Sequence, residues 1–241
     1  MKIAFISSLF GNRGDRPANF KTIEGFDYYL FTDQSYSYIN QGWNIYNISE
    51  NKNISDLTCN IRKSRYAKFM GWELLQSLGK SYDFLYYCDS FYTPNPDSDW
   101  IGSSKHTSSK DFPFLQDVHD NINVRRLGII EECKNIVASK RDSRASINKT
   151  IEFFKNNYPD INLSSPQYFQ NTMFGYNPNS ETLKSFTEEF WDIYISNDIT
   201  YRDQPLWNLL LLKNNLVPTS NPKLKSNFFK WTGQYGNHSY C

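Results

Sequence analysis

Two acidic side chains stand where an apolar element begins or ends, and these positions suit chemistry best. Asp203 precedes Gln204 and the apolar stretch Leu206–Leu212, which we expect to form a buried helix. Asp89 directly follows the hydrophobic run Asp83–Cys88, which we expect to form a strand. Open α/β sheets bind their ligands at the carboxyl ends of strands. Asp89 is therefore a candidate ligand for a bound group.

Asp203 permits two interpretations. An aspartate just before Gln204 and Pro205 is typical of a helix N-cap followed by a first-turn proline, which is a purely structural role. The same position suits a catalytic carboxylate that orients a substrate or takes its proton. Both interpretations stay open on the sequence, with Arg202 and Gln204 as the neighbours that would contact the substrate.

A basic cluster precedes Asp89 in the chain. On helical spacing Arg62 and Arg65 share one polar face, away from the apolar stripe through Ala67 and Met70, and Lys68 follows them. Such a run is ordinarily a solvated helix face. The alternative is a phosphate site, because a helix start attracts anions and arginine grips phosphate through two parallel hydrogen bonds.

A cation site is the next candidate. If Asp89 is an oxygen ligand, the cofactor that we expect is Mn²⁺ or Mg²⁺. The second Asp of a D-x-D motif is missing after Asp89, and the D-x-D at Asp97–Asp99 sits in a Pro-Asn turn, where Asp is favoured by the turn itself. His238 in the basic, aromatic tail is the other candidate ligand. Lys105 and His106 are further polar candidates, although a lone histidine is more often a surface residue.

The elements that must position these residues follow from hydrophobic periodicity. Their alternation over short connections predicts an α/β fold with a mostly parallel central sheet flanked by helices, and no linker divides residues 1–241 into domains. We predict strands at Lys2–Leu9, Phe26–Thr32, Trp43–Ile48, Asp83–Cys88 and Tyr168–Tyr176, with a short one at Trp100–Lys105. We predict helices at Leu57–Leu78, Val124–Ala138, Ser146–Asn156, Glu181–Ile195 and Gln204–Asn214.

Composition narrows the classes of partner and compartment. With 26 Lys+Arg against 25 Asp+Glu there is no overall field to collect nucleic acid or an anionic membrane. No stretch approaches the roughly 18 apolar residues that a membrane span requires. The amino-terminal run is expected to be a strand and not a signal peptide, so we expect a cytoplasmic protein. The four scattered cysteines predict neither a zinc site nor a disulfide framework.

Four motifs, taken in order, resemble a known family. They are Arg62–Lys68, Tyr82–Asp89, Lys105–His106 and Tyr201–Gln204. Together they resemble the plant mucilage and turgor-regulation glycosyltransferase-like family and its viral and bacterial relatives. This resemblance implies a GT-A fold, with a nucleotide-binding part at about residues 1–105 and an acceptor part with the tail at about 106–241.

The resemblance also implies a function. A sugar would pass from a nucleoside-diphosphate-sugar donor to a hydroxyl of a glycan acceptor. The Asp-Gln segment is similar to that of glycosyltransferase family 8, in which the Asp faces sugar and acceptor. Asp203 would then be catalytic, and the general base if the reaction inverts, with Arg202 and Gln204 at the acceptor or sugar and Asp89 and His238 on the cation. The expected donor contacts are Arg13, Asp33, Arg62, Arg65, Lys68, Asp89, Lys105 and His106.

Two other functions remain open on the sequence. A nucleotidyltransferase of sugar metabolism also places a carboxylate at a strand end, but Gly11–Gly14 is sparse for its phosphate loop. A non-catalytic glycan-binding module is supported only by the aromatic content of 17%. Release of nucleotide from a donor without acceptor distinguishes the last of these from a transferase.

Overall fold

A mixed sheet forms the centre of the protein. The computed structural model describes residues 1–11, 20–33, 42–166, 168–221 and 224–232, and within them seven strands pair in the order β3-β2-β1-β4-β7-β6-β8. Four of the six neighbouring pairs are parallel, and β7 is antiparallel to both β4 and β6. The strands are β1 (Ile3–Leu9), β2 (Phe26–Thr32), β3 (Asn44–Asn47), β4 (Phe84–Cys88), β6 (Phe114–Val118), β7 (Phe169–Tyr176) and β8 (Thr219–Ser220).

This topology brings several strand ends to one edge. Because β4 and β6 both run antiparallel to β7, they run parallel to each other, and the start of β7 lies beside their carboxyl ends. From β1 the chain continues to β2 and β3 on one side, whereas β4 lies on the other side of β1. The gap between the carboxyl ends of β1 and β4 is therefore a topological switch point, where open α/β sheets bind ligands.

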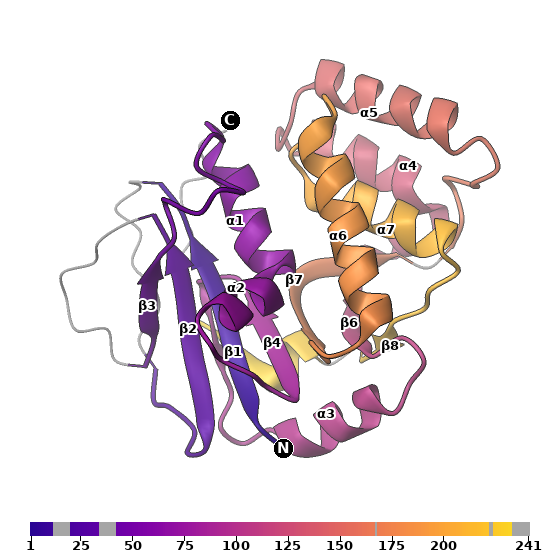
Figure 1. The fold of residues 1–241 in the computed structure, drawn as a ribbon. Helices are drawn as coiled ribbons and strands as arrows, with labels where there is room; N and C mark the ends of the chain where they lie inside the picture. Colours follow the sequence, from indigo (N-terminus) through magenta and orange to yellow (C-terminus); the bar gives the residue numbers. More distant parts are fainter. Residues whose placement is uncertain (12–19, 34–41, 167, 222–223, 233–241) are drawn as a thin grey trace.

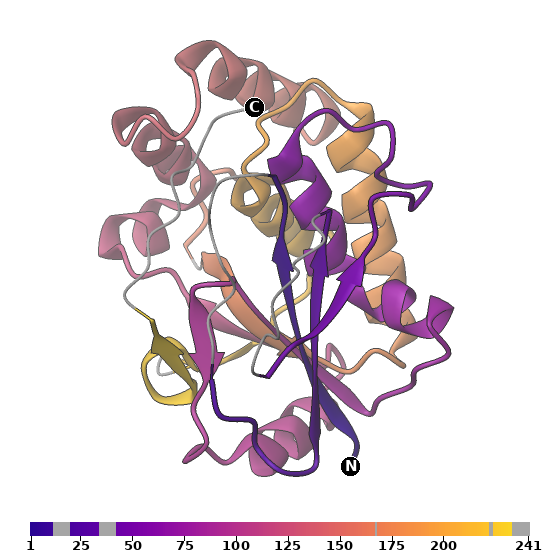
Figure 2. The same cartoon turned by 90° about the vertical axis from the view of Figure 1, so that its left-hand side faces the viewer.

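Helices cover the sheet unequally on its two faces. The larger core lies under α1, α2, α4, α5, α6 and α7, whereas the opposite face packs around Trp100 of α3, η1 and the small β5–β9 sheet. Figures 1 and 2 show these two layers with the sheet between them. The elements are α1 (Asn60–Phe69), α2 (Gly71–Ser77), β5 (Tyr92–Pro94), α3 (Trp100–Ser108), α4 (Ile122–Ala138), α5 (Arg144–Asn157), α6 (Glu181–Ser196), α7 (Asp203–Lys213), the π-helical turn η1 (Leu224–Phe228) and β9 (Phe229–Trp231).

The predicted α/β class and mostly parallel sheet are confirmed, and two predicted elements are wrong. Trp100–Lys105 is not a strand but the start of α3, because the carboxylate of Asp99 caps the helix by accepting the N–H of Gly102 at 2.8 Å. The single helix predicted at Leu57–Leu78 is two helices that meet at Met70. At Gly71 the chain passes so close to β1 that a Cβ atom would lie 2.3 Å from Ile6 Cδ1.

A kink in α4 sets the direction of its second half. Gly128 has φ 63° and ψ −143°, a conformation that side chains with a Cβ atom disfavour. A Cβ there would lie 2.5 Å from the carbonyl oxygen of Ser165, and Ile130 N–H donates to the carbonyl of Leu163 just beyond the kink. The loop before β7 thus holds the part of α4 that carries Glu132.

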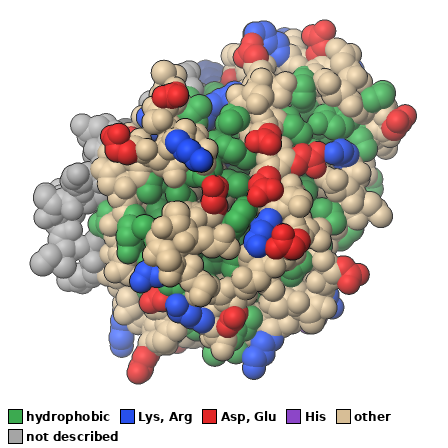
Figure 3. Space-filling view, in the orientation of Figure 1, with side chains coloured by type: hydrophobic (Ala, Val, Ile, Leu, Met, Phe, Trp, Pro, Cys, Tyr) green, Lys and Arg blue, Asp and Glu red, His purple; other side chains and the backbone are tan. Residues whose placement is uncertain are grey.

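Three predictions from composition concern the surface charge, the absence of a membrane span and the state of the cysteines. On the face drawn in Figure 3 acidic and basic side chains are interspersed, so the described residues there make no broad field of one sign. A search of the described helices finds none that combines the length and apolar character of a membrane span. Cys88 and Cys133 are buried free thiols, whereas Cys59 is disulfide-bonded, a bond that the sequence did not predict.

Candidate functional site at the carboxyl edge of the sheet

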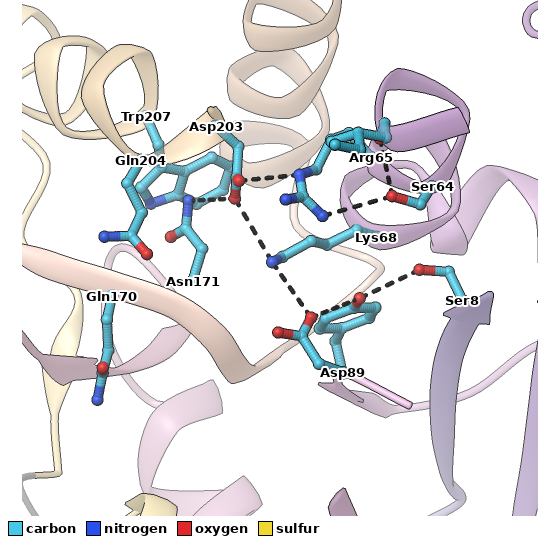
Figure 4. A network of polar contacts seen from close by, with 12 residues as sticks. Ser8, Ser64, Arg65, Lys68, Asp89, Gln170, Asn171, Asp203, Gln204 and Trp207 are labelled. Atoms are coloured by element: carbon cyan, nitrogen blue, oxygen red, sulfur yellow. Dashed lines mark hydrogen bonds and ion pairs between the residues drawn. The ribbon is translucent and has the colours of Figure 1, made fainter. Parts of the chain in front are cut away.

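A buried ion-pair network joins α1 to the ends of β4 and α7 (Figure 4). Arg65 Nε lies 2.8 Å from Asp203 Oδ1. Lys68 Nζ lies 3.4 Å from Asp203 Oδ2 and 3.5 Å from Asp89 Oδ1. The side chains of Lys68 and Asp203 are only 3% and 4% exposed, whereas Asp89 is 35% exposed. One buried ammonium therefore bridges a buried and an accessible carboxylate.

Asp89 is tied to the switch point between β1 and β4. Tyr87 donates its hydroxyl to Asp89 Oδ1 at 2.9 Å, and Ser8 of β1 lies 3.1 Å from the same hydroxyl. The backbone N–H of Asp89 donates to the carbonyl of Thr172 in β7 at 3.1 Å. These bonds span three neighbouring strands, so they fix the carboxylate at the position where this fold class binds ligands.

Asp203 is not the N-cap of α7, so the helix-cap interpretation of this residue was wrong. Arg202 occupies the N-cap position of α7 without a side-chain cap bond, and Asp203 is the first helical residue. Its Oδ2 instead accepts a hydrogen bond from Asn171 Nδ2 at 2.9 Å, in addition to the contacts with Arg65 and Lys68. The acidic group is thus committed to tertiary contacts at the edge of the sheet.

Polar residues within the strands support Asp203 through hydrogen bonds, and none of them was predicted from the sequence. Asn171 Oδ1 accepts from Gln116 Nε2, and Gln116 Oε1 accepts from the indole N–H of Trp207 at 3.2 Å. All three side chains are buried. The only signal in the sequence was the presence of amides inside otherwise apolar strands, because a buried polar group must find partners.

Arg62 has a different role from the donor contact expected of it. Its Nη1 donates to the carbonyl of Tyr194 at 2.5 Å and its Nη2 to that of Ile199 at 2.8 Å. The guanidinium also lies 5.0 Å from the centre of the Tyr194 ring. Arg62 therefore joins α6 to the segment that leads from α6 to Asp203.

The charges of the network are strongly coupled. Burial alone would raise the pKa of Asp203, but Arg65, Lys68 and Arg202 outweigh it and hold that pKa well below its usual range. Burial would lower the pKa of Arg65, yet Asp203 raises it. For Lys68, burial lowers the pKa against the opposing charges of Asp203 and Asp89. Asp203 is thus surrounded by three basic groups, and one of them, Arg202, also interacts with the carboxylate of Glu132.

The other predicted residues fall into four groups. Asp33 accepts the backbone N–H of Gly11 at 2.9 and 3.2 Å, which joins the ends of β1 and β2 at the same edge. Gln204 points away from the network, with its Nε2 3.5 Å from Glu132 Oε1. Lys105 and His106 are exposed on α3, beside the amino terminus in Figure 1, and are not brought together with the network. Arg13 and His238 lie outside the described residues.

The residues around Asp89 do not by themselves make a divalent-cation site. Of the described residues, no three His, Cys, Asp or Glu side chains group as metal ligands do. Asp89 Oδ1 and both Asp203 oxygens already have protein partners, and the ammonium of Lys68 stands between the two carboxylates. The expected Mn²⁺ or Mg²⁺ stays a prediction that depends on His238.

Comparisons with known proteins do not assign the chain to a family. No family model matches the chain, and no curated protein matches it either. The resemblance to the mucilage and turgor-regulation family therefore depends on the motifs alone.

Proposed function

We propose that this chain is a glycosyltransferase that moves a sugar from a nucleoside-diphosphate-sugar donor to a hydroxyl of a glycan acceptor, on a fold of the GT-A type. The observation that carries the proposal is the buried pair of Arg65 and Lys68, which places two cations beside the accessible Asp89 at the switch point. A diphosphate is the ligand that this arrangement suits, because it carries charge in a compact group.

The chemical demand on such a site is to stabilise the departing diphosphate. Charge that develops on a leaving group is stabilised best by preorganised cations in a site with little water. The Nε of Arg65 is committed to Asp203, whereas the single hydrogen bond found for its Nη groups among the described residues is a 3.4 Å contact with Ser64 Oγ. Asp203 thus orients the guanidinium, and the outer edge of the fork stays available for phosphate.

The remaining residues have roles that follow from their places around this pair. Asp89, at the end of β4, lies where the donor sugar would meet the diphosphate. Asp33 lies at the end of β2, on the side of β1 that would receive the nucleoside. Arg202, just before α7, raises the positive charge near Asp203 and lies on the side of Gln204, where the acceptor would enter.

Binding measurements test this proposal before any acceptor is known. Titration calorimetry would compare UDP and GDP with uridine and guanosine, on the wild type and on Arg65→Ala. Removal of a charge-assisted contact to phosphate costs about 1.5–3 kcal/mol, so the affinity for the diphosphate should fall roughly 10- to 150-fold while that for the nucleoside is unchanged. Lys63→Ala, which removes a neighbouring basic group of α1 outside the network, is the matched control and should bind like the wild type.

Two results would count against the proposal. If neither diphosphate binds to the wild type more tightly than its nucleoside, the site is not a diphosphate site. If Arg65→Ala weakens nucleoside and diphosphate equally, or Lys63→Ala matches Arg65→Ala, Arg65 does not contact the phosphate and serves only the ion-pair network.

A further inference from the structure

A second polar group lies next to the ion-pair network, at the carboxyl end of β6. Its centre is Glu132 of α4, whose side chain is only 5% exposed. Glu132 Oε2 lies 3.5 Å from His119 Nε2, and Glu132 Oε1 lies 3.5 Å from Gln204 Nε2. Both contacts are at the outer limit of hydrogen bonding, so this buried carboxylate is held loosely compared with Asp203.

A buried hydroxyl without a partner lies in the same place. Tyr168, just before β7, is fully buried, and its hydroxyl has no hydrogen-bond partner in the described part of the chain. The ring of Tyr168 meets that of His119 edge-on, with centroids 5.7 Å apart. After burial, the charge of Glu132 is the largest influence that raises the pKa of Tyr168. Contacts within the described part of the chain therefore leave both a carboxylate and a hydroxyl incompletely satisfied at this place.

Gln204 connects this second group to the first. It follows Asp203 directly in α7, and whereas Asp203 faces Arg65 and Lys68, the amide of Gln204 faces Glu132. The two groups form one row along the carboxyl edge of the sheet, from Asp89 at the end of β4 to His119 just after β6. A donor held by Arg65 and Lys68 would therefore lie on the same edge of the sheet as Glu132.

We propose that Glu132 is the general base of the transfer, taking the proton of the acceptor hydroxyl, with His119 as its positioning residue. This proposal rests on the proposed function. As the acceptor oxygen bonds to the anomeric carbon, its O–H proton passes to the Glu132 carboxylate. The bond between the anomeric carbon and the diphosphate oxygen breaks, and its electron pair leaves with the nucleoside diphosphate beside Arg65 and Lys68. Attack from the side opposite the leaving group inverts the anomeric configuration.

The surroundings of Glu132 suit this task. His119 Nδ1 accepts the backbone N–H of Asn121 at 3.1 Å, so the neutral ring carries its proton on Nε2, which faces Glu132. Burial lowers the pKa of His119 and favours this neutral form. Burial raises the pKa of Glu132 to about 7 against the opposing charges of Arg202 and Arg141.

Other charges face the pair from the neighbouring elements. Asp203 of α7 raises the pKa of Glu132 further. At His119, Asp120 raises the pKa, whereas Arg141 and Lys225 lower it. A base that titrates near neutral pH matches the optimum for proton transfer. The depressed pKa of Asp203 makes it a poor base, so the sequence-based assignment of the base to Asp203 passes to Glu132.

Donor hydrolysis provides the test, because water can replace the unknown acceptor. Release of nucleoside diphosphate from UDP-glucose, UDP-galactose and GDP-mannose would be followed in the wild type, Glu132→Gln and Glu132→Asp, with donor affinity and melting temperature measured alongside. We expect Glu132→Gln to lose about 100-fold or more in kcat with donor affinity unchanged. The control is Glu131→Gln, which removes the adjacent carboxylate that pairs with Lys134 on the same helix, and it should hydrolyse like the wild type.

The pH profile and the product separate a base from a structural role. In the wild type kcat/KM should fall as pH drops through about 7, and Glu132→Gln should lose this limb while Glu132→Asp keeps it at a lower rate. The sugar released first, seen by proton NMR, should have the inverted configuration. Retention of configuration, or an unchanged rate and pH limb in Glu132→Gln, overturns the assignment of the base. If no donor binds or is hydrolysed by the wild type, the proposed function fails, and the base assignment fails with it.

Discussion

Replacing Asp203 by Asn should destabilise the protein measurably, because the carboxylate is the shared counterion of two buried cations. Its side chain is 4% exposed, and it lies 2.8 Å from Arg65 Nε and 3.4 Å from Lys68 Nζ. Breaking a buried pair by removing one partner costs about 3–5 kcal/mol. Lys68 keeps Asp89 at 3.5 Å, so we expect the lower end, about 3 kcal/mol, or roughly 6–12 °C in melting temperature for a chain of this size.

Urea unfolding measured as a function of pH is a sharper test of the effect of Asp203→Asn on stability. A carboxylate whose pKa is depressed in the folded state contributes stability above its unfolded pKa of about 3.9, and that contribution is lost as pH falls through the folded pKa. The deficit of Asp203→Asn should therefore be full above about pH 5 and shrink below about pH 4. Asp198→Asn, at a carboxylate 84% exposed in the segment between α6 and α7, is the control and should change nothing. A deficit for Asp203→Asn no larger than that of the control, or independent of pH, would refute the network.

Two further substitutions distinguish the roles of neighbouring residues. Asp89→Asn should abolish sugar transfer. It should lower the melting temperature less than Asp203→Asn does, because the Asp89 side chain is 35% exposed. Donor turnover comparable to that of the wild type at saturating Mn²⁺ would contradict a role for the Asp89 charge, including one in holding a cation. Arg62→Lys cannot keep both carbonyl contacts, so thermal unfolding should show a loss of about 1.5–3 kcal/mol of stability. The affinity for the diphosphate should be unchanged. A loss of affinity like that of Arg65→Ala would instead support the donor contact expected from the sequence.

The strands that surround the site were predictable where local sequence decides burial. The runs that form β1, β2 and β4 are nearly unbroken apolar stretches, as expected of strands covered on both faces. The strand β6 was missed because Gln116 and Asp117 interrupt its apolar pattern. The place of β7 between β4 and β6 could not be predicted either, because strand order depends on pairing between residues far apart in the chain.

The residues of the network were predicted better than their contacts. Arg65, Lys68, Asp89 and Asp203 were all candidates, because charged residues beside apolar elements are conspicuous. Burial of Lys68 contradicts the solvated-face interpretation of α1, but helical periodicity could not reveal it, because the residues that cover Lys68 come from β4 and α7. Asn171 was missed for a related reason, since an amide in a strand has no local signature of the partner it will meet.

The sequence alone could not show how the environments of the carboxylates of Asp203 and Glu132 differ. Asp203 follows Arg202 and lies close to Pro205, so the sequence pointed to it as the catalytic residue. Glu132 lies inside an ordinary predicted helix next to Glu131. In the folded protein the two environments differ. Three cations lower the pKa of Asp203, whereas burial raises the pKa of Glu132 to about 7. Where environments push the pKa values of neighbouring acids apart, the ionised one is suited to holding charge and the other to moving a proton. That separation supports the proposal that donor binding and proton transfer occur at adjacent places on one edge of the sheet.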